Sequence, residues 1–138
     1  MRNYKDLRVW DEAHQLTLTI YRATQSFPKE ERFGLTSQIR RASASTAANL
    51  AEGCGRRSDG EMGRFVLIAM GSASELSYHL LLANELSFLS KEQYADLNSR
   101  VERVLKMLSA LFGRLRNASA HRVQSQELRA NGQERLLP

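Results

Sequence analysis

Polar side chains at helical spacing in the middle of the chain are the residues whose types could carry chemistry. The first set is Gln38, Arg41, Ser45, Asn49 and Glu52, and the second set is Ser72, Glu75 and His79. Intervals of three or four residues place each set along one side of a helix. Serine, histidine and a carboxylate can supply a nucleophile, a base and a group that orients the base. An enzyme that uses Ser72, Glu75 and His79 is therefore one hypothesis.

A structural interpretation of the same eight residues has stronger support. One helix would hold Ser72, Glu75 and His79 in a fixed arrangement, and no oxyanion site is evident nearby. Buried polar groups have to be paired, and such pairing fixes the register of two packed helices. We therefore predict that the two sets face each other in a structural polar network and that none of these residues is catalytic.

The sequence lacks signals for metals, cofactors and disulfides. A di-iron centre of the ferritin type requires Glu-x-x-His twice, whereas Glu75 and His79 are four residues apart and nothing repeats them. No phosphate-binding glycine loop and no His-Glu-x-x-His motif occurs. Cys54 is the single cysteine, and although Arg56 and Arg57 could lower its pKa, we favour a small residue packed at a helix end. We predict no metal, no cofactor and no enzymatic activity.

Arginine dominates the charge of the chain. The net charge is +5, and the basic residues are 16 arginines and 4 lysines. The planar guanidinium suits phosphate better than the lysine ammonium does. The candidate nucleic-acid-binding residues are Arg56, Arg57 and Arg64 near a turn, and Arg100, Arg103, Lys106 and Arg114 on the outer side of the last helix. We expect no aromatic residue to be interleaved with them, which favours sequence-tolerant phosphate contacts over base stacking.

Length and composition limit the protein to one small globular domain. A chain of 138 residues has room for a single core, and a hydrophobic content of 42% is enough to fill it. The start of the chain lacks the apolar stretch of a signal peptide, and no run reaches the roughly 20 apolar residues that cross a bilayer. We therefore expect a bacterial-type cytoplasmic protein with no membrane partner.

The hydrophobic pattern has the period of helices. Four periodic segments cover about residues 6–26, 30–55, 58–86 and 90–116. The short links between them favour antiparallel neighbours, so the predicted fold class is all-α, an antiparallel up-and-down four-helix bundle. From residue 117 the pattern fails. We predict a bundle over residues 1–116 and a polar, disordered C-terminal tail over residues 117–138.

The apolar faces of these helices predict a core and an interface. The core stripe of the first helix is predicted to contain Leu7, Trp10, His14, Thr17, Leu18 and Tyr21, widened by Ala13 and Ile20. The stripe of the second helix contains Leu35, Ile39, Ala42, Thr46 and Leu50. The third helix also carries Leu67, Ile68, Gly71, Tyr78 and Leu82 opposite its core stripe. A helix that is apolar on both sides has to be buried on both, and this predicts a homo-oligomer.

Several segments, taken in order, resemble one family of bacterial proteins. They are residues 7–10 (LRVW), 27–35 (FPKEERFGL), 38–42 (QIRRA), 45–53 (STAANLAEG) and 68–76 (IAMGSASEL). Over about residues 4–116 the chain resembles the four-helix-bundle proteins of the 23S rRNA intervening-sequence family. The resemblance implies a bundle that assembles as a ring-like homopentamer. A similar bundle is the accessory protein of diversity-generating retroelements, in which a basic pentamer binds nucleic acid and a reverse transcriptase.

Three functional hypotheses follow from the residues and the resemblance. The leading one is a non-catalytic homo-oligomer, pentameric by resemblance, whose basic surface binds RNA or DNA, or a reverse transcriptase or other nucleic-acid enzyme. The alternative is a protein-binding scaffold with no nucleic-acid ligand, in which the arginines provide solubility. The weakest is the enzyme that uses Ser72, Glu75 and His79.

Overall fold

Four long helices make up most of the described part of the chain. The computed structural model describes residues 2–134, with side chains for residues 2–132. The long helices are α1 (Arg8–Ala23), α2 (Leu35–Cys54), α3 (Asp59–Glu85) and α4 (Lys91–Glu134), and the short 3-10 helices are η1 (Tyr4–Asp6), η2 (Thr24–Ser26) and η3 (Lys29–Glu31). Residues 2–134 contain no strand, which confirms the predicted all-α class.

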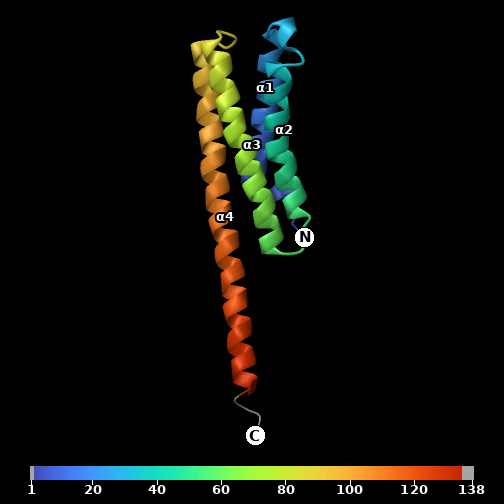
Figure 1. Cartoon of the computed structure of the whole chain (residues 1–138), viewed down its shortest axis with the longest axis vertical. Coiled ribbons are helices and arrows are strands. Elements are labelled where there is room, and N and C mark those ends of the chain that lie inside the picture. Colours follow the sequence, from blue (N-terminus) through green and yellow to red (C-terminus); the bar gives the residue numbers. More distant parts are fainter. Residues whose placement is uncertain (1, 135–138) are drawn as a thin grey trace.

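The long helices lie side by side and alternate in direction (Figure 1). α2 packs against α3, α3 packs against α4, and α1 packs against both α2 and α4. The start of the chain and the turn between α2 and α3 lie at the same end of the bundle, and α4 continues well past this end (Figure 1). This is the predicted up-and-down order of four helices.

Side-chain caps define where α3 and α4 begin. The Ser58 hydroxyl accepts a hydrogen bond from the Glu61 amide at 3.1 Å. The Ser90 hydroxyl accepts one from the Gln93 amide at 3.0 Å, and Gln93 Oε1 accepts one from the Ser90 amide at 3.0 Å. These bonds satisfy amides that the first turn of a helix leaves unpaired. Both helices therefore begin where the local sequence directs them to.

α3 ends in a Schellman motif. The Phe88 amide donates to the Ala83 carbonyl at 2.9 Å, and the Ser87 amide donates to the Asn84 carbonyl at 3.0 Å. Ser87 has a φ of 62°, in the left-handed region that favours glycine. The motif satisfies the last carbonyls of α3 and turns the chain toward α4.

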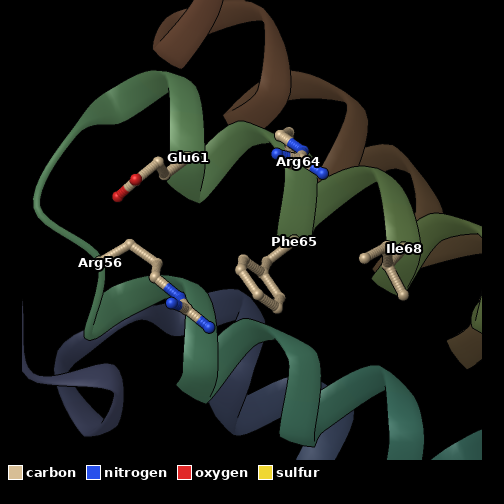
Figure 2. Close-up of a pocket in the computed structure, with 5 residues that line it drawn as sticks. All are labelled: Arg56, Glu61, Arg64, Phe65 and Ile68. Atoms are coloured by element: carbon tan, nitrogen blue, oxygen red, sulfur yellow. The ribbon is translucent and has the colours of Figure 1, made fainter.

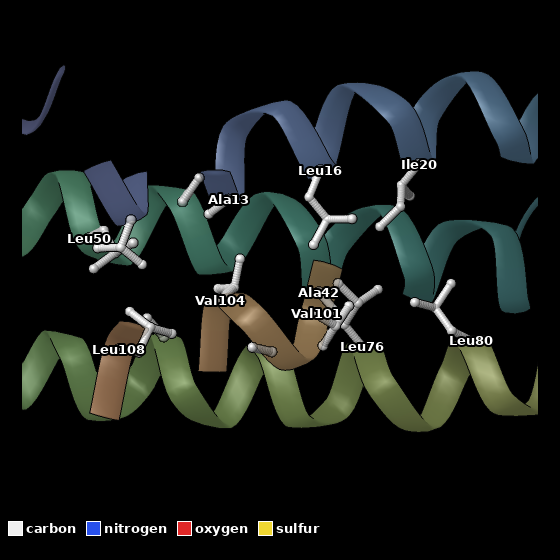
Figure 3. Close-up of a cluster of buried hydrophobic side chains, with 14 of the residues drawn as sticks. Ala13, Leu16, Ile20, Ala42, Leu50, Leu76, Leu80, Val101, Val104 and Leu108 are labelled. Atoms are coloured by element: carbon white, nitrogen blue, oxygen red, sulfur yellow. The ribbon is translucent and has the colours of Figure 1, made fainter. Parts of the chain in front are cut away.

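The core lies between the helices, and Figure 3 shows part of it. On α2 all five residues of the predicted stripe are buried, from Leu35 to Leu50. On α1 the predicted stripe is partly wrong: Ala13 and Ile20 are buried as predicted, but the other buried residues are Val9 and Leu16, which the prediction left out. Tyr21, which the prediction places in the core, is 42% exposed.

Aromatic residues at the rim of the core explain the error on α1. The Trp10 ring stacks on His14 with ring centres 4.9 Å apart and meets Tyr4 edge-on at 4.8 Å. Such rings combine an apolar body with a polar atom, so a partly buried position suits them. Hydrophobic periodicity does not separate rim aromatics from buried aliphatic residues. The predicted stripe is consequently rotated toward Trp10 and His14.

α3 has an exposed apolar face opposite its buried side. Leu67, Ile68 and Tyr78 are 48%, 50% and 60% exposed. By length and composition α3 could also cross a bilayer, since its most apolar 18-residue window has a mean hydropathy of 1.4, and 28% of that window is buried. A single helix of this kind is weak evidence for a membrane segment, because core helices of bundles pass the same test.

The boundary predicted at residue 117 differs from the structure. α4 continues to Glu134, so residues 117–134, here called the C-terminal extension, are helical rather than disordered. Residues 135–138 of the predicted tail lie outside the described residues. Residues 120–132 are exposed, which is why the core pattern ends near residue 117. Continuing an existing helix costs far less free energy than starting one, so the backbone can stay helical where the apolar pattern has stopped.

Candidate functional site

The two predicted polar sets meet where α2 packs against α3, and together they form what we call the polar seam. Arg41 Nη2 lies 2.7 Å from Glu75 Oε1 and also donates to Gln38 Oε1 at 2.9 Å. The hydroxyls of Ser45 and Ser72 are 2.9 Å apart. An ion pair and a hydroxyl pair therefore connect the two helices, and both would break if one helix slipped along the other.

The remaining seam residues make fewer contacts between the helices. Asn49 Nδ2 donates to the Ser45 carbonyl at 2.8 Å and to its hydroxyl at 3.0 Å, so this bond stays within α2. Glu52 pairs with Arg56 at 2.8 Å instead of crossing to α3. His79 Nε2 lies 4.0 Å from Glu75 Oε1, which is beyond hydrogen-bond distance.

The seam does not assemble the hypothesised catalytic group. Ser72 is bonded to Ser45, and within the described residues no hydrogen bond joins it to His79. Both ring nitrogens of His79 are buried without a hydrogen-bond partner among these residues. A nucleophile and its base have to lie within hydrogen-bond reach of each other. The geometry therefore supports a structural role for the seam.

Cys54 is enclosed at the end of α2. Burial raises the pKa of its thiol, and the nearby Arg2 guanidinium lowers that pKa by a smaller amount. The cation that acts on the thiol is therefore Arg2, whereas the sequence pointed to Arg56 and Arg57. A raised pKa keeps the thiol protonated and poorly nucleophilic near neutral pH. Among the described residues, no three His, Cys, Asp or Glu side chains are grouped so that they could hold a metal ion.

The first candidate binding surface is the turn cluster, which we define as Arg56, Arg57 and Arg64 around the turn between α2 and α3. All three side chains are exposed. Arg56 pairs with Glu52. Arg57 and Arg64 have no carboxylate within 4.0 Å among the residues whose side chains are described. Two of the three arginines therefore present charge that no carboxylate neutralises among the side chains of residues 2–132.

An aromatic residue lies inside the turn cluster, contrary to the sequence-based expectation. The Arg56 guanidinium lies 4.6 Å from the centre of the Phe65 ring, within cation–π distance. Figure 2 shows Phe65 extending from α3 toward α2, with Arg56 beside its ring. A surface cavity of about 260 Å³ is lined by Arg56, Glu61, Arg64, Phe65 and Ile68. Phe65 directly follows Arg64 in the sequence, and this adjacency is the signal that was missed.

The second candidate surface, the α4 group of Arg100, Arg103, Lys106 and Arg114, is divided by the structure. Arg100 donates to the Thr19 hydroxyl at 2.9 Å and lies 3.7 Å from Asp96. Arg103 pairs with Glu12 of α1 at 3.0 Å. Lys106 and Arg114 are exposed. Arg103, Lys106 and Arg114 lie on the outer side as predicted and Arg100 is partly buried, but the contacts of Arg100 and Arg103 connect this half of the group to α1.

Comparison with known proteins identifies the family. The profile of the 23S rRNA-intervening sequence protein family matches residues 5–110, which is most of the chain. The protein belongs to this family. A crystal structure of a protein of unknown function from the S23 ribosomal protein family of Bacteroides thetaiotaomicron superimposes with a TM-score of 0.70.

This likeness supports the fold alone. The two chains share 24% sequence identity, and the alignment covers 76% of this chain and 95% of the other. No curated protein matches the sequence. The resemblance expected from the sequence motifs is confirmed.

In this member of the 23S rRNA-intervening sequence protein family, α4 continues beyond the matched region. Asp59, whose side chain is 9% exposed, accepts from Arg2 at 3.1 Å and lies 3.3 Å from Arg122 of the C-terminal extension. One carboxylate therefore joins the chain start, the start of α3 and the extension. The sequence gives no signal for this role of Asp59, because an acidic residue after a helix cap is ordinary and nothing local points to its distant partners.

Proposed function

We propose that this member of the 23S rRNA-intervening sequence protein family is a homo-oligomeric, non-catalytic module that binds nucleic acid through its turn cluster. The observation that carries the proposal is the state of Arg57 and Arg64, which are exposed and lack a carboxylate partner among the described side chains. Guanidinium groups pair well with phosphate oxygens, and binding releases counterions from the nucleic acid. Lys106 and Arg114 add two further exposed cations.

Self-association would bring several turn clusters together. Leu67, Tyr78 and Leu81 form an exposed apolar face on α3, and faces of this kind commonly mark protein contacts. Ala48, exposed on the neighbouring α2, would let a second backbone approach closely. We take a second copy of the chain as the occupant, and the family resemblance favours five copies. Repeated weak phosphate contacts would then add through avidity.

The test of nucleic-acid binding is a fluorescence anisotropy titration of mixed-sequence RNA and DNA with the full chain. We expect binding at about 50 mM salt that weakens at least tenfold at about 200 mM, because each phosphate contact releases counterions. Absence of binding at the lower salt would contradict the proposal. If the chain binds no nucleic acid but captures a specific protein, the protein-scaffold hypothesis is supported instead. If the captured protein is a reverse transcriptase, the partner is a nucleic-acid enzyme.

The test of self-association is the molar mass from light scattering across micromolar concentrations. We expect a multiple of the 15.6 kDa chain mass. Leu67→Glu should lower that mass, because it places a charge within the apolar face. Phe33→Glu is the matched control, since Phe33 is 88% exposed and lies between η3 and α2. A monomer mass for the unmodified chain at all concentrations would contradict self-association.

A further inference from the structure

The geometry points to the cavity beside Arg56 and Phe65 as a subsite for one unstacked nucleobase of a single strand. This inference rests on the proposed nucleic-acid binding and adds a ligand class to it. Phosphate contacts alone would treat duplexes and single strands alike, apart from differences in charge density. A base subsite would make the protein prefer single strands.

The Arg56–Phe65 pair is held in place from several sides. Glu52 Oε1 lies 2.8 Å from Arg56 Nη2, which favours a guanidinium position beside the ring. Phe65 packs tightly against α2, where a Cβ added to Gly53 would lie 3.0 Å from the Phe65 Cβ. The absence of a side chain at Gly53 is therefore what allows the ring to lie so close to α2. Little rearrangement is needed before a planar ligand can stack.

The residues around the cavity suit a base better than a phosphate. Aromatic rings and guanidinium planes are the usual stacking surfaces for unpaired bases. Ile68 adds an apolar wall, and Figure 2 shows it on the same helix as Phe65, beyond the ring. Glu61 would repel a phosphate but can accept a hydrogen bond from the exocyclic amino group of a base. Arg64 borders the same cavity and remains available for the adjoining phosphate.

The size of the cavity fits one heterocycle. Its volume is about 260 Å³, and it opens at the surface between the end of α2 and the start of α3. In a duplex both faces of each base are covered by neighbouring bases, so a base would have to leave the stack to enter. A single strand offers such a base at much lower cost. The expected ligand is therefore single-stranded RNA or DNA with one base held per subunit.

The experiment compares three ligands of equal length with the full chain at low salt. They are a mixed-sequence single strand, the same strand with abasic sites in place of its bases, and the corresponding duplex. We expect the normal strand to bind about fivefold or more tightly than either of the others, which is the size of one stacking contact. Phe65→Leu and Arg56→Lys should each remove this preference and leave the salt dependence in place.

Phe112→Leu is the matched control, because Phe112 is also a partly buried ring but belongs to α4. It should keep the preference for the normal strand. Thermal melting and molar mass identify any variant that fails to fold, and if Phe65→Leu fails, Arg56→Lys carries the test. Equal affinity of the unmodified chain for normal and abasic strands would overturn the inference and leave the proposed function standing. Absence of binding to all three ligands would reject both.

Discussion

The turn cluster and the α4 group are both basic, but their side chains have different partners. In the α4 group, Arg103 pairs with Glu12 at 3.0 Å and Arg100 donates to Thr19 at 2.9 Å. These two residues connect α4 to α1. In the turn cluster, Arg57 and Arg64 have no carboxylate partner among the described side chains. The two surfaces look equivalent in the sequence and are different in the fold.

The number of arginines on a surface is therefore not the number whose charge a phosphate ligand can use. An exposed ion pair adds little stability, yet it already neutralises its arginine. A phosphate that approaches such an arginine has to compete with a carboxylate of the same chain. Counting arginines along a helix therefore overestimates the surface that is available to nucleic acid. Substitutions in the turn cluster and in the α4 group should then have different effects on nucleic-acid affinity.

The largest expected effect is loss of nucleic-acid affinity in the turn cluster. Arg57→Glu with Arg64→Glu should weaken binding at low salt by about 100-fold, because two attractions become two repulsions. Arg22→Glu with Lys29→Glu changes the net charge equally, and these exposed residues lie near the links between α1 and α2. Anisotropy titrations should show only a few-fold loss for this second pair. Equal losses would mean that net charge alone governs binding.

Two glycine substitutions compare the packing of the turn with that of α4. In Gly53→Ala the new Cβ would lie 3.0 Å from the Phe65 Cβ and 3.4 Å from the Met62 carbonyl oxygen. We expect the free energy of unfolding to fall by about 1–3 kcal/mol from this overpacking. Gly113→Ala meets nothing within 4 Å and should raise it by about 0.5–1 kcal/mol, since alanine favours helix. Urea denaturation measures both, and similar effects at the two sites would contradict the tight packing at Gly53.

Asp59→Asn tests how the turn holds the C-terminal extension. The substitution removes the charge that Arg2 and Arg122 share, and we expect a loss of about 1–2 kcal/mol in the free energy of unfolding. Hydrogen exchange should become faster in residues 117–134. Asp96→Asn, at an exposed carboxylate 3.7 Å from Arg100, is the control and should change neither quantity. Unchanged exchange in Asp59→Asn would show that the extension is helical without this contact.

The smallest effect is expected at Arg103. Arg103→Met leaves Glu12 partly exposed, with 28% of its side chain accessible, so water can solvate the carboxylate. The free energy of unfolding should fall by about 0.2–1 kcal/mol, as for other exposed ion pairs. Nucleic-acid affinity should change by less than about twofold, because this charge is already neutralised. A loss of affinity as large as that of the turn-cluster variant would restore the α4 group as a binding surface.

Local sequence signals predicted most of the helical framework. The start of α3 follows from Ser58 and Glu61, and the start of α4 follows from Ser90 and Gln93. The pairing of the two polar sets also follows from their spacing, because helical periodicity places each set on one side. The buried side of α1 was predicted incorrectly, because Trp10 and His14 have apolar rings with a polar atom. The hydrophobic pattern counts them as core residues although they lie at the rim.

The sequence by itself determined that the chain forms four helices, where α3 and α4 begin, and that the two polar sets lie on the sides of α2 and α3 that face each other. These properties depend on hydrogen bonds and periodicities that span a few residues. Only the tertiary structure decided that Asp59 would hold Arg2 and Arg122, that Arg103 would meet Glu12, and that Arg56 would lie beside Phe65. Two of these four contacts, Asp59–Arg122 and Arg103–Glu12, join side chains from separate helices, and the other two join a helix to the chain start or to a turn. Their formation depends on the rotation and register of packed helices, which no local pattern specifies.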